Sequence, residues 1–158
     1  MLIESVPNVS EGRRLDVVDR LAGAVSSVPG VHLLDRTSDA SHNRSVFTMA
    51  GEHDAVAAAL ERLVEVSIHE IDMDIHTGEH PRIGAVDVIP FVPLGATTMD
   101  DAIEMARDFG ARIATRFDLP VFLYANAATR PERVKLTDVP AAYERFARHE
   151  AVKILIDM

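Results

Sequence analysis

The sequence lacks several features that would place a protein in a specialised class. None of its 158 residues is cysteine, which excludes a disulfide framework and thiolate chemistry. It has no apolar run long enough to cross a membrane and no signal-like amino terminus, so we expect a cytoplasmic protein. With a formal net charge of −9 and no run of Lys or Arg, it has no basic face for nucleic acid. An anionic ligand must therefore find locally clustered arginines.

The composition that remains is typical of one globular domain with a sizeable core. Hydrophobic residues make up 47% of the chain and charged residues 26%. Apolar residues at helical spacing predict helices, and Thr98 with Asp101 predicts a capping box before the third of them. The expected helices cover residues 15–25, 54–71, 103–117 and 140–158, and the expected strands cover residues 2–6, 31–35, 45–50, 83–92 and 121–124.

The order of these elements predicts an α+β fold. Strand, helix, strand, strand, helix, strand over residues 1–93 is typical of a ferredoxin-like split βαβ layer, with helices packed on one face of a mixed sheet. The helix and strand within residues 98–124 would extend one edge of that sheet. In this topology the first and third strands form the central pair, so residues 42–44 and 76–82 should meet at one end. Residues 129–158 are expected to be a polar linker and a carboxy-terminal helix.

Titratable side chains concentrate directly ahead of the most apolar strand. Residues 76–87 contain two imidazoles, two carboxylates and a guanidinium. Gly78 and Pro81 prevent a regular helix here, and a residue before proline is pushed toward an extended conformation. His80 is therefore predicted at a loop-to-strand junction with a fixed ring direction, and a solvated surface turn is the alternative. His76 and His80 are four residues apart, but without a helix they do not share one face, so we predict no metal site.

Two other polar segments are candidate binding sites. His42, Asn43 and Arg44 place an imidazole, an amide and a forked cation side by side in a hairpin loop predicted over residues 37–44, a set suited to a carboxylate-bearing ligand. A solvated loop with local turns explains the same pattern. Ser10 and Glu11 precede the first helix, whose free N–H groups could hold an anion or be capped by Ser10, and we favour capping.

Five stretches of the sequence together resemble one protein family. In chain order they are VPNVSEGRR (6–14), LLD (33–35), SHNRSVFTMAG (41–51), HTGEHPRIGAVDVIPFVP (76–93) and LPVFLYANAA (119–128). They resemble the amino-terminal subdomain of glutamate formiminotransferase, which would occupy residues 1–128 and leave residues 129–158 unmatched. The resemblance implies transfer of the formimino group of N-formimino-L-glutamate to N5 of tetrahydrofolate, a co-substrate, in histidine breakdown.

The resemblance also implies roles for individual residues. The histidine of the family's GEHPR motif is its proposed general base, and it falls on His80. An imidazole with an ordinary pKa of about 6.5 can take the proton lost by N5 and return one to the departing glutamate nitrogen. Arg44 and Arg82 are candidates for binding carboxylates. The remaining candidates for binding substrate or folate are His42, Asn43, His76 and Asp87, of which Asn43 and Asp87 would orient the ligand.

Two functional hypotheses remain open at this point. Family members continue into a second subdomain that closes the folate site, whereas this chain does not match them after residue 128. The first hypothesis is a formiminotransferase whose other lobe comes from another chain, a second copy of itself or a longer parent sequence. The second is a non-catalytic module that binds folate or an acidic metabolite, or only assembles. An open sheet face opposite the helices would favour self-association, so we expect a homo-oligomer or a second subdomain.

Overall fold

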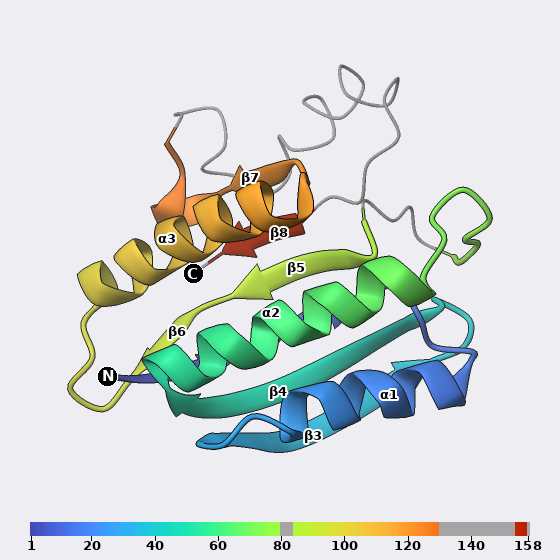
Figure 1. The fold of residues 1–158 in the computed structure, drawn as a ribbon, viewed down its shortest axis with the longest axis horizontal. Helices are drawn as coiled ribbons and strands as arrows, with labels where there is room; N and C mark the ends of the chain where they lie inside the picture. The colour runs from blue at the N-terminus through green and yellow to red at the C-terminus, as the bar shows by residue number, and fades with distance from the viewer. Residues whose placement is uncertain (80–83, 130–153, 158) are drawn as a thin grey trace.

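The structure is a computed structural model that describes residues 1–79, 84–129 and 154–157. In the described residues the α-helices lie against the same face of one sheet (Figure 1). The helices are α1 (Leu15–Ser26), α2 (His53–Glu70), α3 (Met99–Phe117) and the short 3₁₀ helix η1 (Ala125–Ala127). The strands are β1 (Leu2–Ser5), β2 (Asn8–Val9), β3 (Val31–Asp39), β4 (Arg44–Glu52), β5 (Val86–Pro90), β6 (Val92–Leu94), β7 (Val121–Leu123) and β8 (Ile154–Asp157).

The first and third predicted strands lie side by side at the centre of the sheet. β1 pairs antiparallel with β4 on one side and with β6 on the other. Its continuation β2 pairs with β4 and β5, and β3 pairs with the outer side of β4. β8 lies parallel to β5 and to β7, so the sheet is mixed. The predicted central pairing is therefore confirmed.

The prediction of an α+β fold is confirmed, and two of its details change. β3 continues to Asp39, because Thr37 and Ser38 pair with Val46 and Ser45 across the hairpin instead of forming a loop. Ile154–Asp157 form a strand where we predicted a helix, since this apolar stretch completes a parallel ladder between β5 and β7. The finer assignment to a ferredoxin-like layer stays a prediction, because the first strand is divided into β1 and β2 and the sheet is extended by β7 and β8.

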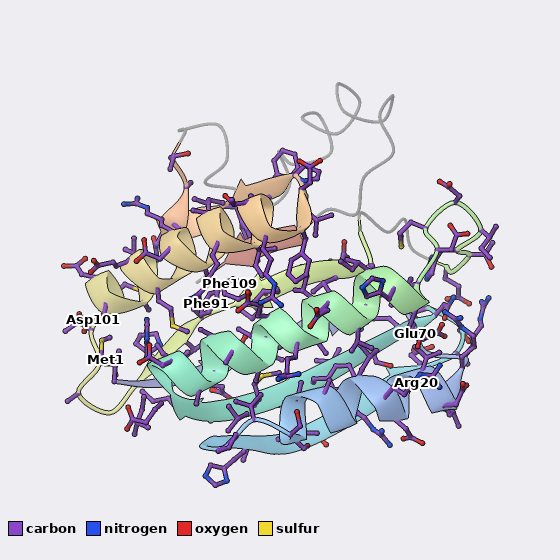
Figure 2. All side chains as sticks on the ribbon, viewed as in Figure 1. Met1, Arg20, Glu70, Phe91, Asp101 and Phe109 are labelled. Atoms are coloured by element: carbon purple, nitrogen blue, oxygen red, sulfur yellow. The ribbon has the colours of Figure 1, made fainter. Side chains whose placement is uncertain are left out.

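The apolar core fills the space between the helices and the sheet. Alternate residues of β4 are buried beneath the helices, so the strand presents one apolar face to them. On the α3 side the rings of Phe91 and Phe109 meet edge to face, with centroids 5.4 Å apart (Figure 2). Each fully buried side chain of this kind contributes about 2–3 kcal/mol. In the part of the chain that the structure describes, no helix is long and apolar enough to span a membrane.

The amino terminus of α3 has the capping box predicted from its sequence. The side chain of Thr98 accepts a hydrogen bond from the Asp101 N–H at 3.2 Å, and the Asp101 carboxylate accepts one from the Thr98 N–H at 2.8 Å. Two free N–H groups at this helix end are thereby satisfied, which fixes where α3 begins.

Candidate functional site

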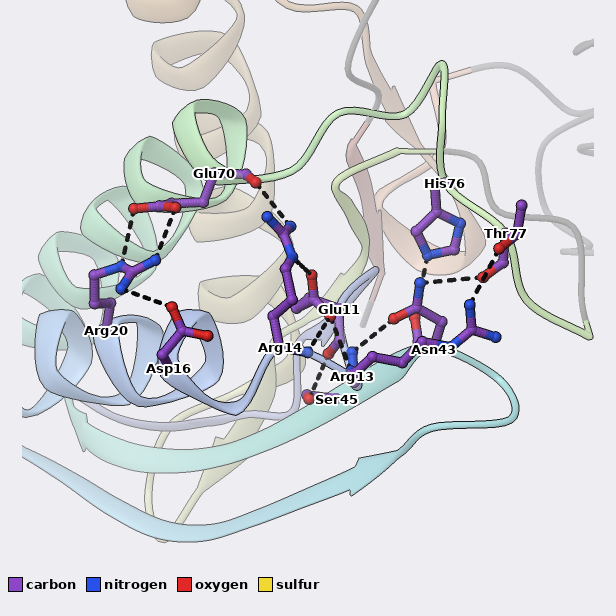
Figure 3. A network of polar contacts seen from close by, with 11 residues as sticks. Glu11, Arg13, Arg14, Asp16, Arg20, Asn43, Ser45, Glu70, His76 and Thr77 are labelled. Carbon is purple, nitrogen blue, oxygen red and sulfur yellow. Dashed lines mark hydrogen bonds and ion pairs between the residues drawn. The ribbon is translucent and has the colours of Figure 1, made fainter.

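Three segments far apart in the sequence meet at one end of the sheet. They are residues 10–14 between β2 and α1, residues 39–44 at the β3–β4 turn, and residues 76–79 after α2, hereafter the polar junction (Figure 3). The Glu79 N–H donates to the Ser41 carbonyl at 3.2 Å, and Arg13 Nε donates to the Ala40 carbonyl at 2.7 Å. The predicted meeting of the hairpin tip with the histidine segment is thus present for residues 76–79.

Two glycines allow the backbones of these segments to approach one another closely. A Cβ atom on Gly12 would lie 2.5 Å from the carbonyl oxygen of Asp39 and 2.6 Å from the nitrogen of Arg44. One on Gly78 would lie 3.0 Å from the carbonyl carbon of His42 and closer still to its oxygen. Because the obstacles are backbone atoms, no side-chain rotation could relieve these contacts. Any larger residue at either position would force the segments apart.

Asn43 contacts both of the other segments of the junction. Its Oδ1 accepts a hydrogen bond from the Gly12 N–H at 3.0 Å, and its Nδ2 donates to the Thr77 carbonyl at 3.1 Å. Its own carbonyl oxygen lies 3.2 Å from Nε2 of His76. The residue is only 8% exposed and has a φ of 49°, a left-handed conformation that asparagine adopts more readily than most residues.

Glu11 is a buried carboxylate, 3% exposed, that organises the start of α1. Its Oε1 accepts from the N–H groups of Arg13 and Arg14 at 2.9 Å each, and Oε2 pairs with Arg14 Nε at 2.5 Å. Burial by itself would raise the pKa of Glu11, but the hydrogen bonds from Arg14 and Arg13 outweigh it, so the pKa is lowered. The N–H groups of Arg13 and Arg14, which precede α1, therefore already bind a carboxylate of the protein itself.

Ser10 does not cap this helix as we predicted. Its hydroxyl donates instead to the Gly84 carbonyl at 2.7 Å, and its N–H donates to the Ala85 carbonyl at 2.9 Å. Both bonds tie the start of the junction to the segment that enters β5. The prediction of capping by Ser10 is therefore wrong: among the described residues no side chain caps α1, and Glu11 instead binds the N–H groups of Arg13 and Arg14 just before the helix.

The ring of His42 is held between two carboxylates at the hairpin tip. Nδ1 lies 2.7 Å from Asp39 Oδ2, and Nε2 lies 3.7 Å from Glu79 Oε2. Hydrogen bonds to Asp39 from the backbone and then from the ring of His42 lower the pKa of that carboxyl, although burial opposes them. His42 thereby links the hairpin to the residue that directly precedes His80.

A pocket of about 270 Å³ opens between the junction and the end of α2. Arg13, Asn43, His76 and Thr77 line it, together with Glu70–Asp72 and neighbouring side chains. Arg13 Nη1 donates to Thr77 Oγ1 at 3.1 Å, and within the described residues the guanidinium forms no ion pair. The pocket thus combines an arginine held by neutral acceptors with carboxylates. This arrangement suits a ligand that carries charges of both signs.

Two other residues proposed from the sequence, Arg44 and Asp87, lie outside the junction pocket. Arg44 lines a separate pocket of about 280 Å³ with Thr37, Asp39 and Val46. Because alternate residues of β4 are buried under the helices, Arg44 lies on the opposite face of the sheet. Asp87 is half-buried in β5 and is not part of the junction pocket. His80 and Arg82 lie outside the described residues.

The sequence did not identify the residues of the junction that act through backbone contacts. Gly12 and Arg13 were not singled out, and Glu11 was weighed only as a neighbour of the helix end. All three belong to the SEGRR stretch that the family resemblance had already marked. The family resemblance of the whole stretch was the signal that could have identified these residues. No charge pattern in residues 10–14 indicates which backbone groups their side chains will contact.

Comparison with known families agrees with the resemblance found in the sequence. The family model for the formiminotransferase domain, N-terminal subdomain, matches residues 2–155. The chain belongs to this family. The match continues beyond residue 128, where the resemblance had ended, and includes the residues of β8 up to Leu155.

Individual relatives carry names of the same kind. Glutamate formimidoyltransferase of Streptococcus pyogenes serotype M1 is 46% identical over 138 residues, which make up 87% of this chain and 46% of that protein. The corresponding protein of Thermoplasma acidophilum is 44% identical over 152 residues, or 96% of this chain and 49% of that one. Formimidoyltransferase-cyclodeaminase of Rattus norvegicus is 41% identical over 140 residues, 26% of its length. The chain spans about half the length of the first two relatives and less of the third.

Proposed function

We propose that this chain forms one wall of a site that transfers the formimino group of N-formimino-L-glutamate to N5 of tetrahydrofolate. The observation that carries the proposal is the junction itself: in a formiminotransferase-family chain, residues 76–79 are fixed against the hairpin and end one residue before His80. A catalytic group works best when its approach to the substrate is set by such fixed neighbours. On this proposal the layer formed by β1–β6, α1 and α2 is the ferredoxin-like half of the enzyme.

In the proposed reaction His80 is the general acid and base. N5 of tetrahydrofolate attacks the formimino carbon, and the imidazole accepts the proton that N5 loses as the new N–C bond forms. The same proton then passes to the glutamate nitrogen as its bond to that carbon breaks, so glutamate leaves and the ring returns to its starting state. Acid and base help of this kind contributes about a hundredfold to ten-thousandfold in rate.

The charges of the substrates fit the charges around the junction. Formiminoglutamate carries two carboxylates and a basic amidine, and folate carries a glutamyl tail. Arg13 offers a guanidinium in the junction pocket, where Asp72 also offers a carboxylate. We propose Arg13 as a further carboxylate-binding residue, in addition to the sequence candidates Arg44 and Arg82, since a guanidinium matches a carboxylate with two parallel hydrogen bonds.

A second wall is part of the same proposal. Sites for cofactor-sized ligands bury most of the ligand and lie preferentially between domains. Arg44 faces away from α1 and α2, on the side of the sheet that the described helices do not cover (Figure 1). We propose that a second subdomain or a second copy of the chain covers that side. Light scattering combined with activity measurement tests this, because a strictly monomeric chain with normal turnover would contradict it.

A steady-state assay with formiminoglutamate and tetrahydrofolate tests the catalytic role. His80→Ala should lower kcat by about a hundredfold or more while the protein stays folded. His53→Ala is the matched control, because His53 lies at the far end of α2, where among the described residues its ring hydrogen-bonds only the neighbouring Asp54. Equal activity of the two variants would remove His80 from the mechanism. Folate binding without any turnover in the unsubstituted protein would instead favour the non-catalytic module.

A further inference from the structure

We propose that Asn43 is a positioning residue for the histidine segment 76–79. Its side chain ties Gly12 to Thr77, and its carbonyl oxygen sets the tautomer and direction of the His76 ring. The kinetic consequence of this arrangement rests on the proposed function, whereas the structural link itself does not.

The chemistry of the partners fixes how the Asn43 amide is oriented. The Gly12 N–H can only donate, so it must face Oδ1, and the Thr77 carbonyl can only accept, so it must face Nδ2. A flipped amide would oppose donor to donor and acceptor to acceptor. Both polar ends are therefore committed to the protein, and the residue is 8% exposed, which leaves little of it to contact a ligand. This arrangement suits a clamp between segments.

The backbone carbonyl of Asn43 likewise fixes which nitrogen of the His76 ring carries the proton. A carbonyl oxygen has no proton, so His76 Nε2 must carry one for the 3.2 Å contact to be a hydrogen bond. The neutral ring is then protonated at Nε2 and keeps its lone pair at Nδ1. The carbonyl takes this direction in a residue whose φ is 49°, a conformation open mainly to Gly, Asn and Asp.

The hydrogen bond from Asn43 to Thr77 helps to fix the chain that leads to His80. After Thr77 come Gly78, packed against the His42 carbonyl, and Glu79, whose N–H donates to Ser41. Asn43 is thus the first of three successive anchors that hold the chain on its way to His80. A displacement of about 1 Å in a catalytic group can cost a hundredfold in rate. Releasing the first anchor should therefore reduce turnover without removing any catalytic atom.

Two substitutions separate the parts of the clamp. Asn43→Gly keeps the left-handed backbone accessible and deletes both side-chain bonds. Asn43→Asp keeps an acceptor for the Gly12 N–H but places a carboxylate oxygen against the Thr77 carbonyl, so only that link is lost. Asn126→Gly and Asn126→Asp are the matched controls, because Asn126 is exposed in η1 and, within the described part of the chain, its amide contacts only the sulfur of Met99, at 3.9 Å.

Three measurements on the folded proteins decide the proposal. In Asn43→Gly the amides of Gly12, which loses its acceptor, and of Glu79, which is held at Ser41, should exchange with solvent about tenfold faster or more. The ¹⁵N shifts of His76 should move toward an average of the two tautomers, because the released segment no longer holds the ring against the carbonyl of residue 43. The kcat for formimino transfer should fall about tenfold to a hundredfold, with a smaller change in KM. Asn43→Asp should show the same changes in Glu79 and His76 while the Gly12 amide stays protected, and it replaces Asn43→Gly if that variant does not fold.

Contrary results are distinguishable from one another. Unchanged exchange and unchanged His76 shifts in a folded Asn43 variant, or equal changes in the Asn126 controls, would overturn the clamp. Altered spectra with an unaltered kcat would overturn the positioning role. If the unsubstituted protein transfers no formimino group even in the assembled form that supplies its second wall, the proposed function fails, and the exchange and ¹⁵N measurements still decide whether Asn43 holds the histidine segment.

Discussion

The apolar core and the polar junction are held together by different kinds of contact. Around Phe91 and Phe109 the contacts are between side chains, and the two rings are fully buried against many neighbours. At the junction the contacts involve backbone atoms, with the side chains of Glu11 and Asn43 bonded to N–H and carbonyl groups. The core therefore spreads its stabilisation over many side chains, whereas the junction depends on a few residues at fixed positions.

This difference predicts how each region responds to substitution. Loss of a core side chain should reduce the free energy of unfolding strongly and leave the geometry of the distant junction unchanged. A change at the junction should cost less stability, because fewer apolar contacts are lost, and should displace the histidine segment. The following substitutions test the difference, beginning with the largest expected effect on stability.

Phe109→Ala should produce the largest loss of stability. The side chain is fully buried and its ring lies 5.4 Å from that of Phe91, so truncation leaves a cavity beside that ring. Such truncations cost about 3–5 kcal/mol, which urea denaturation would measure. Leu15→Ala is the control, since Leu15 is 63% exposed and should change stability by less than about 0.5 kcal/mol. Similar losses in both variants would contradict the burial of Phe109.

Gly78→Ala should have a smaller effect on stability and a larger one on the junction. A Cβ at this position would press on the His42 carbonyl, so the two segments must separate at a cost of about 2 kcal/mol. Gly23→Ala is the matched control: in α1 its Cβ would have no neighbour within 4 Å. Alanine there should stabilise the helix by about 0.5–1 kcal/mol. If both substitutions were stabilising, the close approach at Gly78 would be refuted.

The core could be predicted from the sequence because it is encoded by repetition. Helical spacing identified α1, α2 and α3 to within a few residues, and the capping box identified the start of α3. Each such pattern involves many residues, so a single unusual position does not hide it. The prediction failed at Ile154–Asp157, where four residues are too few to show a period and the partner strands β5 and β7 decide the structure.

The junction could be predicted only in part, because single residues at long separation encode it. The sequence indicated that residues 42–44 and 76–82 should meet, since this follows from strand order alone. It placed Asn43 and Arg44 in one site, but Asn43 lies in the turn with a φ of 49° whereas Arg44 begins β4, and the two line different pockets. It gave no reason to expect Glu11 rather than Ser10 to bind the N–H groups before α1, because that depends on which backbone groups come within reach after folding.

Glu11→Gln should have the smallest effect and a characteristic pH dependence. The hydrogen bonds and ion pair that lower the pKa of Glu11 below its ordinary value of 4.5 stabilise the folded protein whenever the carboxyl is ionised. That contribution is complete above 4.5, the value in the unfolded chain, and is lost as the pH falls through the lower folded pKa. At neutral pH the variant should be less stable by about 1 kcal/mol, since glutamine keeps one oxygen for the two backbone N–H groups but loses the charge and the acceptor for Arg14 Nε. Urea denaturation of both proteins at a series of pH values should show this difference shrinking toward acid. A constant difference at every pH would mean that Glu11 acts by its shape, and that the start of α1 does not depend on the charge of its buried carboxylate.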